Sequence, residues 1–168
     1  MKYRIIVGII AAAAFLPLYF WVKSLAGGLL WTYYLYETGR AAALAAVPLV
    51  AAQYILTSRR QILERGVGLD RLTGLHRWIG LALCVMLLAH PSLMIAAERL
   101  QGYSSPFAPA RFPGVAALLC TLVAAGAALM HGRISFFNYE RWKAFHLAAY
   151  GILPLAMVHG YFLGYVSR

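Results

Sequence analysis

The stretch LHRWIGLALCVMLLAH, residues 75–90, carries a histidine near each end of a segment that is otherwise apolar and of membrane-spanning character. An ionisable side chain inside a bilayer is costly, and such side chains usually mark a functional site. His76 and His90 are therefore the first candidates for a function. The rest of the chain has to account for two imidazoles on one membrane helix.

The composition is that of a membrane protein. Of the 168 residues, 62% are hydrophobic and only 12% are charged, a balance that is not typical of soluble domains. Five charge-free runs reach or nearly reach the roughly 20 residues that a membrane-spanning helix needs. Transmembrane β-strands would be about half as long and would alternate polar with apolar residues, which these runs do not. The runs are Ile5–Val22, Ala41–Ser58, Trp78–Ala97, Phe112–His131 and Ala144–Ser167.

The sequence thus predicts an all-α membrane protein, a bundle of five transmembrane helices in a single domain over residues 1–168. The first run also fits a secretory signal, because MKYR precedes it. A signal core is usually about 7–15 residues long, whereas this run has 18 residues and four aromatic rings. We therefore expect an uncleaved helix. The expected helices cover residues 5–22, 41–58, 73–97, 112–131 and 141–167.

The basic residues predict an orientation in the membrane. The formal net charge is +10, but the Lys and Arg side chains are divided unevenly, ten in one set of alternate connections and five in the other. By the positive-inside rule, the N-terminus lies in the cytoplasm and the C-terminus lies outside. This distribution of charge indicates the lipid bilayer as a partner. It does not indicate nucleic acid.

The cysteine and glycine patterns limit the cofactors. Cys84 and Cys120 lie in the middle of two expected helices, and no Cys-x-x-Cys-His motif occurs, so covalent c-type haem is excluded. Free thiols that pack as small apolar groups are expected instead. No nucleotide-binding glycine pattern follows a strand-like segment, so the chain does not house a flavin or nicotinamide.

Four of the five histidines form two pairs. His76 and His90 are fourteen residues apart, and His146 and His159 are thirteen apart. The helices 73–97 and 141–167 are separated by an even number of crossings, so they run parallel. His76 and His146 then lie at one level and His90 and His159 at the other, about 20 Å apart. Two stacked b-type haems need such an arrangement, since each iron takes one imidazole from each of two facing helices.

Other readings of the histidines remain open. One haem, a packing role or a metal-transport path would also place histidines in membrane helices. A zinc or copper path would more naturally add Cys, Met, Asp or Glu at ligand spacing. No acidic residue lies within the five charge-free runs.

The rotational phase of the histidines differs between the two helices. Fourteen residues bring His90 back to within about 40° of His76, whereas thirteen leave His159 about 140° away from His146 on an ideal helix. Two haems therefore require a local distortion of the 141–167 helix, which we expect near Pro154. Pro91 directly follows His90, disfavours helical geometry there and predicts a bend or an end of the helix.

Two segments of this chain resemble the ferric reductase-like transmembrane family. They are GLHRWIGLALCVMLLAH (74–90) and YERWKAFHLAAYGILPLAMVHGYFLG (139–164). The family includes metalloreductases, NADPH oxidases and the haem-binding membrane subunit of bacterial periplasmic methionine sulfoxide reductase. The resemblance covers the second to fifth expected helices. It implies a multi-pass protein of the bacterial inner membrane whose two haems pass electrons outward. The iron ligands that it implies are His76 with His146 and His90 with His159.

The chain departs from the family in its ending. Many members continue into a sixth helix and a cytoplasmic domain with FAD and NAD(P)H, whereas this sequence ends shortly after the fifth helix. We therefore expect FAD or NAD(P)H only on a partner chain, with a separate flavoprotein or membrane quinol as electron donor. An outer-side acceptor or partner subunit would receive the electrons. The alternative is a quinol-oxidising cytochrome b subunit, which also pairs histidines on parallel helices.

Haem propionates are anionic and need cationic partners near hydrocarbon. Arg77 adjoins His76 and is the first candidate, although it can instead reach a lipid phosphate. The tryptophans are expected to anchor the membrane interface, and His131 is expected to be interfacial with no partner at its level. The propionate candidates are Arg77, Arg71, Arg141 and Lys143 at one level and Arg111 at the other.

Overall fold

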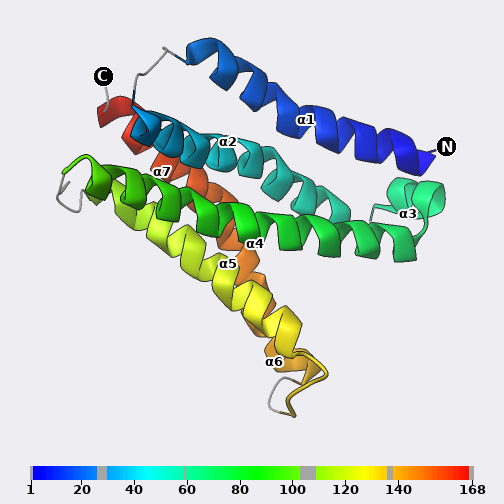
Figure 1. Ribbon diagram of the computed structural model, residues 1–168. Coiled ribbons are helices and arrows are strands. Elements are labelled where there is room, and N and C mark those ends of the chain that lie inside the picture. The colour runs from blue at the N-terminus through cyan, green and yellow to red at the C-terminus, as the bar shows by residue number, and fades with distance from the viewer. Residues whose placement is uncertain (1, 26–29, 59, 103–108, 136–137, 167–168) are drawn as a thin grey trace. The chain divides into compact units, whose positions relative to one another are not determined.

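The computed structural model describes residues 2–25, 30–58, 60–102, 109–135 and 138–166. Their secondary structure is entirely helical, and no strand occurs among them (Figure 1). Five helical segments are long and apolar enough to cross a membrane, the last of them over Tyr139–Phe162. The predicted fold class, an all-α membrane protein with five membrane helices, is confirmed. The elements are α1 (Lys2–Ser24), α2 (Trp31–Thr57), α3 (Gln61–Val67), α4 (Leu69–Leu100), η1 (Pro109–Arg111), α5 (Phe112–Met130), α6 (Tyr139–His146), η2 (Leu147–Gly151) and α7 (Ile152–Val166).

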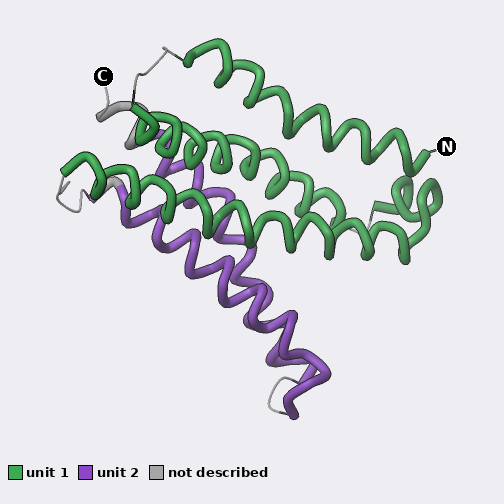
Figure 2. Tube along the Cα trace, viewed as in Figure 1, with its two compact units in different colours: residues 1–104 green, residues 105–168 purple. Residues whose placement is uncertain are grey.

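The chain divides into two compact units, residues 1–104 and 105–168 (Figure 2). The first unit holds α1 to α4, and the second holds η1 to α7. His76 and His90 belong to the first unit, whereas His146 and His159 belong to the second. Each unit is therefore described by itself.

Helix α2 packs along α4 in the first unit, and α1 packs along α2 (Figure 1). Small residues line the α2 contact, among them the buried Ala45 and Ala46. Gly39 is also buried, and a Cβ built on it would lie 3.0 Å from the Met94 Cγ. Small side chains let helix backbones approach closely in a membrane. They therefore bring α2 close to the helix that carries His76 and His90.

The α2 helix begins at Trp31, ten residues before the expected 41–58 helix. The expected helix was taken from a charge-free run, which begins after Glu37 and Arg40 and so left both residues out. In the structure the Glu37 carboxylate accepts hydrogen bonds from the Trp21 Nε1–H and from the Arg40 guanidinium, both at 2.8 Å. The two charges satisfy each other, so the helix accommodates both. The expected helix was too short because each charge was treated as unpaired and therefore as incompatible with a membrane helix.

The buried Glu37 carboxylate also joins α1 to α2, which makes it a test of the first unit. Glu37 is 6% exposed, and Glu37→Leu would leave both the indole N–H and the Arg40 guanidinium without their acceptor. We expect a loss of about 1–3 kcal/mol in the free energy of unfolding, measured as a lower unfolding temperature in detergent. Glu37→Gln keeps one acceptor oxygen and should lose less. The matched control is Glu64→Leu in α3, and an equal loss in this variant contradicts the assignment.

Helix α4 is continuous from Leu69 to Leu100, with Pro91 in its interior. Of the two outcomes expected at Pro91, a bend or an end of the helix, the end does not occur, and the helix continues as the expected range 73–97 requires. A proline removes one backbone hydrogen bond, but a helix that ended inside a bilayer would expose several backbone groups that water cannot reach. His90 lies ten residues, or about 15 Å, before the C-terminal end of α4.

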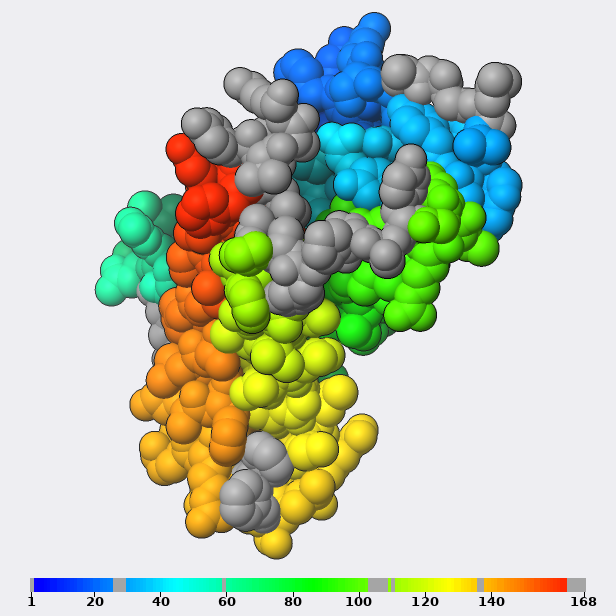
Figure 3. Space-filling model, turned by 90° about the vertical axis from the view of Figure 1, so that its left-hand side faces the viewer, coloured from blue at the N-terminus to red at the C-terminus, as the bar shows by residue number. Residues whose placement is uncertain are grey.

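In the second unit, α5 packs along the segment from α6 to α7, and the space-filling view shows these yellow-green and orange-red segments side by side (Figure 3). The buried residues of α5 are small, Ala117, Thr121, Ala124 and Ala127. Cys84 of the first unit and Cys120 of the second are both free and half-buried, which confirms the expected free thiols.

Candidate functional site

The four paired histidines are half-buried, and each lies on a segment that a neighbouring helix supports. His76 and His90 lie on α4, which packs against α2. His146 is the last residue of α6 and His159 lies in α7, and α5 packs against both helices.

The imidazole of His90 is held by a backbone carbonyl of α2. Its Nδ1 lies 2.9 Å from the carbonyl oxygen of Gly39. A carbonyl oxygen only accepts, so Nδ1 carries the proton, and in the neutral ring the lone pair is on Nε2. Histidines that bind metals commonly donate their second ring N–H to such an acceptor, which fixes the tautomer and the ring orientation. His90 therefore has the tautomer that an axial ligand needs.

His146 repeats this arrangement in the second unit. Its Nδ1 lies 3.2 Å from the carbonyl oxygen of Ala124 on α5, so the same reasoning leaves Nε2 as the ligating nitrogen. Each unit thus presents at least one imidazole with its lone pair on Nε2.

The turn that carries His76 is tied to α2 by a side chain. The Gln53 amide donates from Nε2 to the backbone carbonyl of His76 at 3.0 Å, and a Cβ on Gly80 would lie 3.2 Å from the same nitrogen. Gly39 and Gln53 are fourteen residues apart on α2, as are His76 and His90 on the antiparallel α4. Helix α2 therefore supplies one polar contact at each histidine level.

The imidazole of His159 packs against Gly114 of α5. A Cβ built on Gly114 would lie 2.7 Å from the ring Cε1, 2.8 Å from Nδ1 and 2.9 Å from Nε2. Any larger residue at this position would displace the ring. Arg111 is half-buried and lies directly before α5, three residues ahead of Gly114. This propionate candidate therefore lies at the same end of the unit as His159.

A 3₁₀-helix changes the phase of the two histidines in the second unit. The five residues of η2 (Leu147–Gly151) lie between His146 and His159. A 3₁₀-helix turns about 120° per residue and so adds about 100° over η2, which brings His159 to within about 40° of His146. The rise between them becomes about 22 Å, against about 21 Å between His76 and His90.

The local distortion that the histidine spacing requires is therefore present. It lies three to seven residues before Pro154. This proline has no N–H for the carbonyl of Tyr150, and its ring crowds that oxygen. The regular hydrogen-bonding pattern is interrupted at this turn, and tighter winding takes its place.

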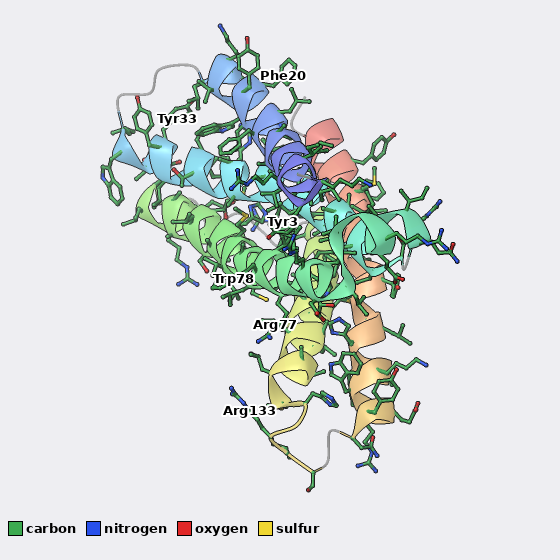
Figure 4. The ribbon with its side chains drawn as sticks, turned by 90° about the vertical axis from the view of Figure 1, so that its right-hand side faces the viewer. Tyr3, Phe20, Tyr33, Arg77, Trp78 and Arg133 are labelled. Atoms are coloured by element: carbon green, nitrogen blue, oxygen red, sulfur yellow. The ribbon has the colours of Figure 1, made fainter. Side chains whose placement is uncertain are left out.

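The basic candidates lie on helix surfaces. Arg77 and Trp78 directly follow the His76 position on α4 (Figure 4). Trp78 is 73% exposed, as an interfacial anchor would be. Lys143 lies three residues before His146 and so on nearly the same face of α6. The contacts of the basic side chains with haem propionates stay predictions. The exposed residues are Arg71 and Arg77 on α4 and Arg141 and Lys143 on α6.

Trp142 lies close to two imidazole rings, those of His131 and His146. The ring centroids of His131 and Trp142 lie 5.1 Å apart, and those of Trp142 and His146 lie 5.3 Å apart with the planes at 20°. The turn after α5 thus brings His131 to the ring of Trp142, and its expected interfacial position stays a prediction. Trp142 also stacks on a candidate ligand, and its expected role as an interfacial anchor stays a prediction.

Residues 42–157 match the model of a protein family described as the ferric reductase like transmembrane component. The chain belongs to this family. No curated protein and no solved structure matches it. As a ferric reductase-like protein it is a multi-pass membrane protein, and the family generally binds haem and transfers electrons across membranes. The matched range includes His76, His90 and His146, and His159 lies two residues beyond it.

Several site residues of this ferric reductase-like chain do not stand out in the sequence. Gly39 and Ala124 contribute backbone carbonyls, which every residue possesses. Gln53 and Gly114 carry a weak signal, because a lone amide or a glycine inside an apolar helix often marks a close contact. The distance from Gly39 to Gln53 is fourteen residues, the same as from His76 to His90. This is the one sequence pattern that could have indicated these two α2 residues.

Proposed function

We propose that this chain transfers electrons across the bacterial inner membrane through two non-covalently bound b-type haems. His76 and His146 ligate one iron, and His90 and His159 ligate the other. The observation that carries the proposal is the contact of the His90 and His146 Nδ1 atoms with backbone carbonyls. It supports axial ligation because Nε2 keeps its lone pair in both rings.

The residues of the chain position and insulate the cofactors. Two histidines would hold each iron and would leave it no vacant position for an acceptor. Bound haem supplies the one-electron chemistry. The carbonyls of Gly39 and Ala124 fix two imidazoles, and Gly114 leaves space for a third. The cationic partners proposed for the propionates are Arg77, Arg71, Arg141 and Lys143 for the first haem and Arg111 for the second.

The direction of transfer follows from the loop charges. With the N-terminus in the cytoplasm and the C-terminus outside, the His76–His146 haem lies on the cytoplasmic side and the His90–His159 haem on the outer side. A separate flavoprotein that carries FAD or NAD(P)H, or a membrane quinol, supplies the electrons. An acceptor or partner subunit on the outer side receives them.

The cofactor content tests this function directly. The purified protein is expected to contain two haems per chain in a pyridine haemochrome assay, because the proposal pairs the four histidines at two levels. A reduced-minus-oxidised spectrum should show a b-type α-band. One haem per chain contradicts the two-level assignment, and no haem contradicts the redox function. Reduction of the same preparation by quinol or by a flavin reductase with NAD(P)H then identifies the donor.

A further inference from the structure

Three aromatic rings form a stack at one end of the second unit. His131 directly follows α5 and is exposed, whereas Trp142 and His146 lie on α6 and are half-buried. The Trp142 indole contacts both imidazoles, with centroid distances of 5.1 Å to His131 and 5.3 Å to His146. The stack therefore leads from the protein surface to a ring that the proposed function assigns to iron.

The imidazole of His146 is restrained by groups on two different helices. The Ala124 carbonyl on α5 lies 3.2 Å from Nδ1, at the long end of the range for N–H···O bonds. The Trp142 indole on α6 covers one face of the ring, with the two planes only 20° apart. Residues four apart on a helix are neighbours, so α6 itself holds the indole in place. A rotation of the imidazole would disturb both contacts.

We propose that Trp142 is a positioning residue that sets the plane of the His146 imidazole and, through it, the electronic state of the haem iron. This inference rests on the proposed function, in which His146 is an axial ligand. The angle between an axial imidazole and the porphyrin axes governs the splitting of the iron d orbitals. The electron-rich indole face also favours positive charge on a neighbouring ring. Trp142 thereby influences one haem and leaves the other unchanged.

The test compares substitutions at two tryptophans that lie near ligands. Trp142→Leu removes the stacked ring, whereas Trp142→Phe keeps an aromatic face. The matched control is Trp78→Leu, because Trp78 lies two residues after His76 and is 73% exposed. The measurements are haem content, the g values of the ferric haems by electron paramagnetic resonance, and a redox titration.

Trp142→Leu is expected to shift the largest g value and the midpoint potential of one haem only. Trp142→Phe should give a smaller shift, and Trp78→Leu should match the wild type. Wild-type signals in a Trp142→Leu protein that holds two haems overturn the inference and leave the proposed function intact. If Trp142→Leu loses the haem, Trp142→Phe decides: a displaced signal in one haem supports the inference, and unchanged signals overturn it. A wild-type protein without haem instead refutes the proposed function itself.

Discussion

Replacing His90 by alanine is expected to reduce the haem content from two per chain to one and to abolish electron delivery to an impermeant external acceptor. The substitution removes an axial ligand of the proposed outer-side haem and leaves His76 and His146 in place. A cytoplasmic donor should still reduce the remaining haem. His159→Ala should behave in the same way, because it removes the opposite ligand of the same iron. Haemochrome assays and the rate of external reduction in oriented vesicles measure both effects.

Two further histidine variants make this result specific. His76→Ala should also leave one haem, but this haem should no longer be reduced by the cytoplasmic donor, since entry of electrons is blocked. His131→Ala should retain two haems, because His131 is assigned to no iron. If His90→Ala reduces the external acceptor at the wild-type rate, the ligand assignment and the orientation are both wrong.

Gly114→Ala is expected to have an effect nearly as large, although it removes no ligand. The added methyl group would lie 2.7–2.9 Å from three atoms of the His159 ring, so the ring has to move away from its position. We expect one haem per chain instead of two, with the His76–His146 haem retained.

Gly126→Ala is the matched control for this substitution. Gly126 lies on the same helix, and nothing is found within 4 Å of a Cβ at this position. It should therefore retain both haems. Equal haem contents in the two variants contradict a role for Gly114 in seating the His159 imidazole.

The membrane helices could be predicted from the sequence because hydrocarbon imposes a simple rule on length and charge. The rule fails where charges neutralise each other. Glu37 and Arg40 form an ion pair at 2.8 Å, so α2 contains both of them although each alone would argue for a loop. Pro91 likewise suggested a bend or an end in α4, but the surrounding bilayer makes a free helix end more costly than one lost hydrogen bond.

The candidate ligands could also be predicted, because histidines are rare in membrane helices and two pairs at matched levels form a recognisable pattern. Their supporting contacts could not. The carbonyls of Gly39 and Ala124 are backbone groups, so their role depends on where the neighbouring helix lies and on no side-chain chemistry. The stack of Trp142 on His146 has a local origin, since the two residues are four apart. It becomes a restraint only because the α5 carbonyl holds the same ring.

On the proposed ligand assignment, the 3₁₀ turn between His146 and His159 allows the two helices to carry different histidine intervals. Thirteen residues that include one tightly wound turn reach nearly the same rotation and height as fourteen residues of regular helix. A search pattern that demands one fixed histidine interval on both helices would reject this chain. A pattern written as an angle and an axial distance would accept it. For a protein engineer, the same equivalence means that a residue deleted from a ligand-bearing helix can be compensated by a proline that tightens the preceding turn.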